Sequence, residues 1–182
     1  MLPVYIDKEV IDACLNGQAQ SQELLYRTCY PVFMKICLRY TDSYDDAANV
    51  LQESFIKIFS RLNDFKGSGD FVGWMRRIVV NTSIDHVRKQ KLQGHQSIDT
   101  VPEIAEEPDA EFSKYVIDEM QLLKLIRELP KMQSLVFNLF VLEDYSHQMI
   151  AEQLSIKVSQ SKWYLFDARK ILQKKLSHYV ND

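Results

Sequence analysis

Cysteine is scarce in this sequence, and the three that are present form no Cys-x-x-Cys pair. Cys14, Cys29 and Cys37 therefore lack the close spacing of structural zinc ligands. Each lies among apolar residues of a helical pattern, so we predict small buried side chains in a reducing compartment. No metal or other cofactor is expected.

Long apolar runs are also missing. None approaches the roughly 20 residues that a helix needs to cross a bilayer. The first residues, MLPVYIDKEV, lack the charged-then-apolar order of a signal peptide. We expect a cytoplasmic protein without membrane insertion.

Recurrent catalytic motifs are absent as well. The histidines (His86, His95, His147 and His178) show neither an H-x-x-x-H nor an H-E-x-x-H pattern. The glycines of KGSGD lack the Lys-Ser/Thr of a phosphate-binding loop, and no G-x-S-x-G occurs. The sequence therefore predicts neither an enzyme nor a small-molecule substrate.

Sustained alternation of apolar and polar residues, the mark of a strand, is missing. Apolar residues recur instead at helical spacing, which predicts an all-α fold of two small helical domains. The helices are expected at 7–16, 20–41, 44–62, 71–91, 119–129, 131–142, 146–154 and 158–176.

Charge is distributed unevenly around a net value of −3. Residues 1–91 carry +1, residues 92–119 carry −7 and residues 120–182 carry +3. The acidic part contains prolines and a glycine, which disfavour a stable helix. We predict a four-helix domain (1–91), a flexible acidic linker (92–118) and a C-terminal helix-turn-helix domain (119–182).

The segment 71–91, FVGWMRRIVVNTSIDHVRKQK, combines aliphatic bulk with positive charge. Trp74 and Ile78 share one face with Ile84 or Val87. Polar residues spaced four apart form a separate stripe. The stripe consists of Arg77, Asn81 and Asp85, and it is extended by Arg76, Arg88, Lys89 and Lys91. One side of this helix is expected in the core and the other against nucleic acid.

The loop NDFKGSGD (63–70) precedes that helix. Phe65 offers a stacking plane and Lys66 a positive charge, while Gly67 and Gly69 permit tight backbone paths. Such a loop can hold a base that has left the duplex, since stacking and hydrogen bonds offset the cost of unstacking.

The C-terminal segment has the pattern of a helix-turn-helix. Ser146 is the expected cap of a short helix, and a turn of three residues leads to a second helix. The side chains expected to face outward there suit base edges, phosphates or a thymine methyl group. They are Ser159, Gln160, Lys162, Trp163, Phe166, Arg169 and Lys170. A structural bundle with a solvated basic face remains an alternative, as does inward packing of Trp163.

The stretch from DAANVLQESF to SIDHVRK resembles the second conserved region of bacterial sigma factors of the extracytoplasmic-function (ECF) subfamily. The matching positions in the first part are Asp46, Ala47, Leu51, Gln52, Glu53 and Phe55, and those in the second part are Phe71, Trp74, Arg77, Ile78, Asn81, Ile84, Asp85 and Arg88. The segment from YSHQMIAEQLSI to SKWYLFDARKIL resembles the fourth region of the same family.

The resemblance implies a subunit that binds core RNA polymerase and promoter DNA and helps to melt the start site. It also implies a regulatory anti-sigma factor. The implied contacts with the start-proximal (−10) element are Phe65, Lys66, Trp74, Arg76, Arg77, Asn81, Asp85 and Arg88. The residues expected at the upstream (−35) element are the seven outward ones of the C-terminal helix. Docking on polymerase is implied for Asp46, Asn49, Gln52 and Glu53.

Three residues depart from the family's pattern: Asn49 replaces a carboxylate, Ser155 a turn glycine and Asp167 a common basic residue. Near a phosphate, Asp167 is expected to repel. Two other functions remain open. A stand-alone helix-turn-helix regulator explains 146–170 but leaves the first domain unexplained. A nucleic-acid enzyme or a structural adaptor is the third hypothesis.

Overall fold

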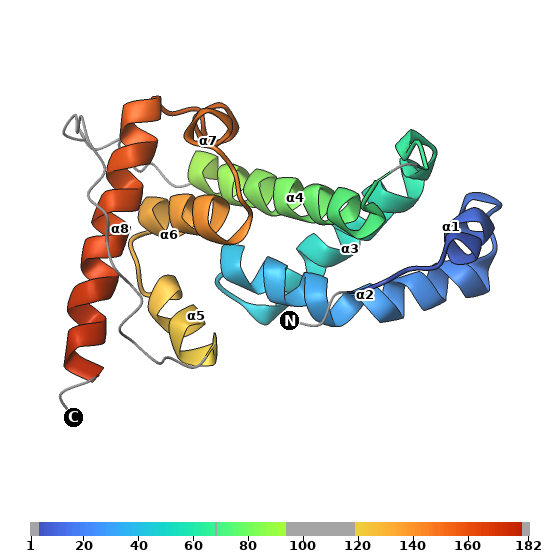
Figure 1. Ribbon diagram of the computed structural model, residues 1–182, viewed down its shortest axis with the longest axis horizontal. Helices are drawn as coiled ribbons and strands as arrows, with labels where there is room; N and C mark the ends of the chain where they lie inside the picture. The colour runs from blue at the N-terminus through green and yellow to red at the C-terminus, as the bar shows by residue number, and fades with distance from the viewer. Residues whose placement is uncertain (1–3, 68, 94–118, 180–182) are drawn as a thin grey trace. The chain divides into compact units, whose positions relative to one another are not determined.

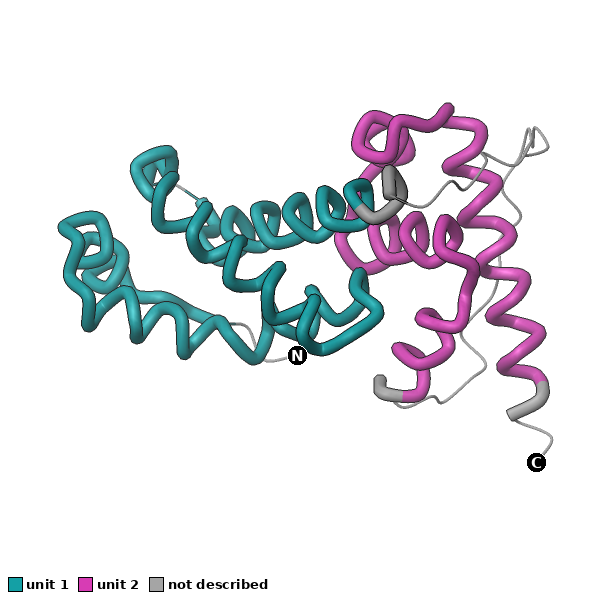
Figure 2. The backbone as a smooth tube through the Cα atoms, turned by 180° about the vertical axis from the view of Figure 1, so that it is seen from behind, with its two compact units in different colours: residues 1–96 teal, residues 97–182 magenta. Residues whose placement is uncertain are grey.

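The structure, a computed structural model, describes residues 4–67, 69–93 and 119–179. Every regular element within these ranges is a helix, which confirms the predicted all-α fold. The chain divides into two compact units, residues 1–96 and 97–182 (Figure 2). The predicted linker lies outside the described residues from position 94 onward.

Unit 1 is built from four α-helices, shown in blue to green in Figure 1. They are α1 (Lys8–Leu15), α2 (Ala19–Tyr40), α3 (Tyr44–Ser60) and α4 (Phe71–Gln93), with a 3₁₀ turn η1 (Leu62–Asp64) after α3. Helices α2, α3 and α4 pack against one another, and α1 packs on α2. The four predicted helices are therefore confirmed, with ends shifted by one or two residues.

Local chemistry fixes where these helices begin and end. Gly17, which follows α1, has a φ of +74°, a left-handed conformation that other residues adopt at a cost. Ser43 caps α3: its Oγ accepts a 3.0 Å hydrogen bond from the Asp46 N–H and donates a 2.7 Å bond to the Asp46 carboxylate. The Asp46 N–H at the start of α3 and the Ser43 hydroxyl proton thereby each have a hydrogen-bond acceptor.

The core of unit 1 comes from α2, α3 and α4. Its cysteines are buried, as predicted, and burial raises the pKa of Cys29 to about 11 and that of Cys37 to about 12. At neutral pH both are therefore thiols, which are weak nucleophiles. The largest fully buried side chains of this unit are Leu25, Phe33, Tyr40, Leu51, Ile58, Met75 and Ile84.

Unit 2 contains α5 (Glu119–Arg127), α6 (Lys131–Phe137), α7 (His147–Leu154) and α8 (Val158–Tyr179). After α6 the chain makes a π-helical turn, η2 (Asn138–Leu142), where the sequence predicts one continuous helix. The Glu143 N–H donates to the carbonyl of Asn138, five residues earlier, at 3.1 Å. The buried side chains of this unit include Leu125, Ile126, Leu135, Val136, Leu139, Ile150, Leu165, Ala168, Leu172 and Leu176.

Candidate nucleic-acid interface

Helix α4 is covered on most of its circumference and leaves one narrow polar strip. Arg77 and Asp85 are exposed, and Asn81 between them is half-buried. The helix packs against α2 and α3 with its other faces. The expected polar stripe therefore faces solvent, and the residues around it are buried: Met75, Ile78, Val79, Val80, Thr82, Ser83, Ile84 and Val87.

The centre of this stripe has an unused acceptor. Oδ1 of Asn81 is buried and accepts no hydrogen bond from the described residues. Leaving such an acceptor unpaired costs about 1–3 kcal/mol. The Arg88 guanidinium lies 3.7 Å from the Asp85 carboxylate, and both side chains stay partly exposed. An ion pair of this kind is weak, so both groups remain available to a ligand.

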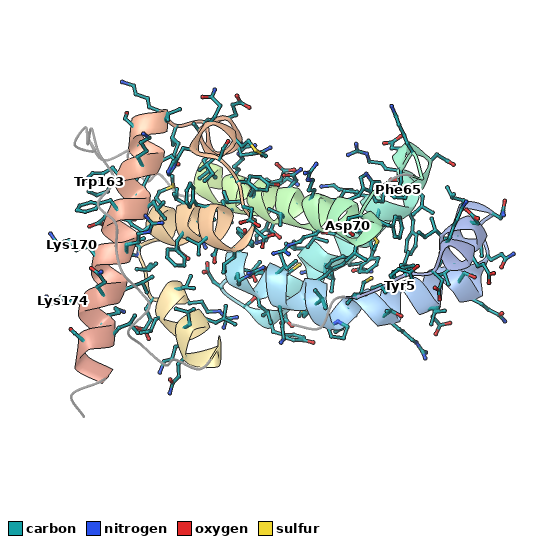
Figure 3. The ribbon with its side chains drawn as sticks, in the orientation of Figure 1. Tyr5, Phe65, Asp70, Trp163, Lys170 and Lys174 are labelled. Atoms are coloured by element: carbon teal, nitrogen blue, oxygen red, sulfur yellow. The ribbon has the colours of Figure 1, made fainter. Side chains whose placement is uncertain are left out.

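The loop before α4 is anchored by an aromatic cluster. The Phe65 ring lies edge-on to Phe71 at 4.9 Å between centroids and 5.8 Å from Trp74. Phe71 and Trp74 are stacked at 5.7 Å. Phe65 is half-buried and forms part of this cluster. Figure 3 labels Phe65 and Asp70, which flank the loop at the start of α4.

Asp70 and Gly73 form a pair that sequence reasoning missed. Asp70 is the residue before α4, and its carbonyl accepts a 2.9 Å bond from the Trp74 N–H. A Cβ at Gly73 would lie only 2.5 Å from the Asp70 carboxylate oxygen Oδ2. The glycine thus leaves room for a carboxylate over the first turn, where the helix dipole favours negative charge.

The outward face of α3 is polar around one apolar side chain. Asn49 and Gln52 are exposed, and Ile56, one turn further, is 64% exposed. Ile56 is the most exposed large apolar residue of α3, and its exposure was missed in the sequence. Its signal was visible there, because the helical repeat places it opposite the buried positions Leu51 and Ile58.

Two other residues of α3 that were expected to bind polymerase already have partners. The Glu53 carboxylate lies 2.8 Å from Lys57 Nζ, and this hydrogen bond lowers the pKa of Glu53. Lys57 also donates to Thr82 Oγ1 of α4 at 3.3 Å. The carboxylate of Asp46 accepts from the cap residue Ser43, so its observed contact is structural.

Helices α7 and α8 form the expected helix-turn-helix. Ser146 caps α7 by accepting a bond from the Met149 N–H at 3.2 Å. Ser155 ends α7 with φ 54° and ψ 47°, the left-handed conformation usually taken by glycine. The Gln160 side chain accepts from the Lys157 N–H at 2.8 Å, which caps α8. The oxygen of Gln160 is therefore occupied, and only its amide NH₂ remains for a ligand.

One edge of α8 points away from the rest of unit 2. Figure 3 shows Trp163, Lys170 and Lys174 along this edge. Trp163 is half-buried and meets the Tyr164 ring at 5.4 Å, so part of its surface packs on its own helix. Arg169 instead lies over the Phe140 ring, 5.9 Å from its centroid. Half-buried positions also include Ser159, Lys162 and Phe166.

Asp167, expected to repel phosphate, has a defined partner. Its Oδ2 accepts a 2.9 Å hydrogen bond from Nε2 of Gln133, which lies on α6. These residues are 34 positions apart, so the sequence pattern gave no sign of the contact. A second link in unit 2 joins Nδ1 of His147 on α7 to the hydroxyl of Ser161 on α8 at 2.8 Å.

Two kinds of feature are absent from the described part of the chain. No group of three or more His, Cys, Asp or Glu side chains is arranged to hold a metal ion there. No described helix combines the length and apolar character needed to cross a membrane.

Family models match most of the described chain. Residues 25–93 match Sigma-70 region 2, and residues 119–172 match Sigma-70 region 4. The chain is 25% identical over 193 residues to the RNA polymerase sigma-H factor of Pseudomonas aeruginosa, with 100% of both chains covered. It is 26% identical over 181 residues to the ECF RNA polymerase sigma-E factor of Haemophilus influenzae, covering 93% of this chain and 95% of that protein.

Solved structures share the fold. The sigma factor RpoE of Bartonella quintana, in complex with the anti-sigma factor NepR, matches with a TM-score of 0.52 at 18% identity. That match covers 85% of this chain and 96% of the other. CnrH, in complex with the cytosolic domain of CnrY, matches with a TM-score of 0.52 at 16% identity, over 94% and 97% of the chains. The chain belongs to the extracytoplasmic-function group of the sigma-70 family, the promoter-specificity subunits of bacterial RNA polymerase.

Proposed function

We propose that the exposed stripe of α4 and the anchored loop before it hold the unpaired strand of the −10 element during transcription initiation. The observation that supports this most is the burial pattern of α4. A helix covered on most of its surface still presents Arg77, Asn81 and Asp85 to solvent. Asn81 is half-buried in this stripe and its Oδ1 is enclosed by the protein, so the proposed base contact uses the exposed part of its side chain.

In unit 2 we propose that α8 enters the major groove at the −35 element. Trp163, Phe166 and Lys170 are the residues most suited to base or phosphate contact, with Ser159 and Lys162 at the start of the helix. Gln160 contributes through its NH₂ group alone, since its oxygen caps the helix. Arg169 contributes less than expected from sequence, because its guanidinium lies over Phe140.

Docking on core RNA polymerase is proposed for the outward face of α3. Asn49 and Gln52 provide exposed polar groups, and Ile56 provides an apolar anchor. An apolar anchor within a polar rim is the usual arrangement of an interface hot spot. Glu53 takes part through its remaining carboxylate oxygen, and Asp46 contributes less because its carboxylate already accepts a hydrogen bond from the cap residue Ser43.

We propose regulation by an anti-sigma factor, because the sigma factor RpoE of Bartonella quintana, which has the same fold, was solved in complex with the anti-sigma factor NepR. We expect the inhibitor to cover the α3 face or the edge of α8 until a signal releases it. A partner of core polymerase works in the cytoplasm, and the chain itself needs no catalytic group. Bond formation belongs to the polymerase.

The test is run-off transcription with core RNA polymerase on a library of promoters, with and without the chain. The proposal predicts that the chain directs initiation from a subset that shares two sequence elements. Arg77→Ala with Asn81→Ala abolishes this while core capture in a pull-down stays intact. Transcription unaffected by these changes would contradict the proposal. Tight sequence-specific binding of duplex DNA without polymerase would favour the stand-alone regulator, which leaves the region 2 match unexplained.

A further inference from the structure

Helix α8 carries one acidic residue, Asp167. It comes four residues after Trp163 and three before Lys170, so the helical repeat places it beside them on the outward edge. Figure 3 shows the two neighbours on that edge. The other charged side chains of α8 are basic: Lys162, Arg169, Lys170, Lys174 and Lys175.

The Asp167 carboxylate is held in a fixed direction. Gln133, which donates to Oδ2 at 2.9 Å, is only 8% exposed, so the packing of unit 2 fixes its amide. Asp167 itself is half-buried. Gln133 is its only polar partner within the described residues, which leaves Oδ1 as an acceptor without a donor.

Only some groups in the major groove can donate a hydrogen bond to Oδ1. Phosphate oxygens repel a carboxylate, whereas the exocyclic amino groups of cytosine and adenine donate. Adenine also presents its N7 acceptor beside that amino group, and N7 repels the carboxylate because both groups are hydrogen-bond acceptors. Cytosine presents a donor alone, which is why carboxylates pair with its N4.

We propose that Asp167, oriented by Gln133, is a specificity-determining residue that selects a cytosine within the upstream promoter element. This rests on the proposed entry of α8 into the groove. Under this proposal the single acidic residue of α8 contributes to base recognition and does not merely repel phosphate.

The experiment uses holoenzyme assembled from core RNA polymerase and the full chain. Bound duplexes are selected from a library whose upstream element is randomised. In Asp167→Ala the preference for cytosine at one position is expected to fall by about five-fold or more, with the other positions unchanged. In Asp167→Asn the amide NH₂ takes the place of Oδ1, so the preference should shift from cytosine to a base that presents an acceptor in the groove, such as guanine or thymine. The asparagine also keeps an oxygen for Gln133, so this variant remains informative if the alanine variant does not fold.

Glu152→Gln is the matched control. Glu152 is an exposed carboxylate on α7 that accepts a 3.2 Å bond from the Gln148 amide, so the change removes one charge from a similar pair. It is expected to leave every base preference intact. If Asp167→Ala and Asp167→Asn raise binding equally on all sequences, Asp167 only repels phosphate and the inference is wrong. If the wild-type holoenzyme selects no upstream sequence, the proposed role of α8 fails first.

Discussion

At the scale of single residues, Lys57 links α3 to α4 through two contacts. Its partner on α3, the Glu53 carboxylate, titrates in acid, whereas its partner on α4, the Thr82 hydroxyl, does not. Its Nζ lies 2.8 Å from the Glu53 carboxylate on α3 and donates to Thr82 on α4. The bond lowers the pKa of Glu53 below its ordinary 4.5. A lowered pKa in the folded state contributes stability above pH 4.5 that is lost as the pH falls through the folded value. Both side chains are partly exposed, so the contribution is about 0.3–0.5 kcal/mol.

Lys57→Met should therefore destabilise the protein more at neutral pH than in acid. The bond to Thr82 is lost at every pH, whereas the loss at Glu53 matters only while that carboxylate is ionised. Urea unfolding at neutral pH and at a pH well below 4.5 measures the difference. Lys35→Met, at an exposed position of α2, is the control. An unfolding penalty for Lys57→Met that is the same at both pH values would contradict the assignment.

The close approach of Gly73 to Asp70 predicts that substitutions at these two positions have coupled effects on folding stability. Alanine normally stabilises a helix by roughly 0.5–1 kcal/mol relative to glycine. At Gly73 its Cβ would meet the Asp70 carboxylate at 2.5 Å and displace it from the start of α4, which costs a similar amount. Gly73→Ala should change the free energy of unfolding little in the wild type, but stabilise the Asp70→Ala background. A denaturant double-mutant cycle measures this coupling, and additive effects would exclude the contact.

At the scale of secondary-structure elements, the turn of the helix-turn-helix contains local strain. Ser155 has a φ of 54°, where a residue with a side chain pays about 1–2 kcal/mol relative to glycine. Ser155→Gly should raise the free energy of unfolding of unit 2 by about 1 kcal/mol, after the entropy of glycine in the unfolded chain is subtracted. Gly17→Ala, at a φ of +74°, should act in the opposite direction in unit 1. Thermal melts followed by circular dichroism would refute this if Ser155→Gly lowered the midpoint.

Helix α3 offers a matched pair of isoleucines. Ile58 is fully buried, so Ile58→Ala should cost about 2–5 kcal/mol of folding stability. Ile56 is 64% exposed, so Ile56→Ala should leave stability within about 0.5 kcal/mol. We expect Ile56→Ala nevertheless to weaken capture of core polymerase about five-fold or more. Undiminished capture in a titration with labelled core enzyme would remove Ile56 from the docking face.

Much of this architecture follows from periodic patterns. The helices could be predicted because their apolar residues recur on one face, and the caps at Ser43 and Ser146 because hydroxyl residues precede those runs. The contacts of Asp167, Phe65 and Gln160 could not be predicted. Asp167 accepts a hydrogen bond from a residue 34 positions away. Phe65 packs in an aromatic cluster, and the oxygen of Gln160 caps α8. The spacing of apolar residues along the sequence indicates none of these contacts.

At the scale of the whole molecule, negative charge is concentrated in one segment between two neutral to mildly basic parts of the sequence. The segment 92–119 carries −7, while the residues on either side carry +1 and +3. An acidic segment between two DNA-binding units opposes tight binding of DNA by the free chain, because phosphates repel it. Promoter binding is therefore expected to depend on core polymerase.

The most direct measurement is the affinity of the assembled holoenzyme for a single-stranded oligonucleotide carrying the non-template −10 sequence. Fluorescence anisotropy at saturating core polymerase compares wild type with Asn81→Ala and, as a control, Asn49→Ala on the docking face. Base contacts of this kind are worth about 1–3 kcal/mol, so Asn81→Ala should weaken binding about five-fold or more while Asn49→Ala has no effect. Equal affinity of wild type and Asn81→Ala for the single strand would contradict the account.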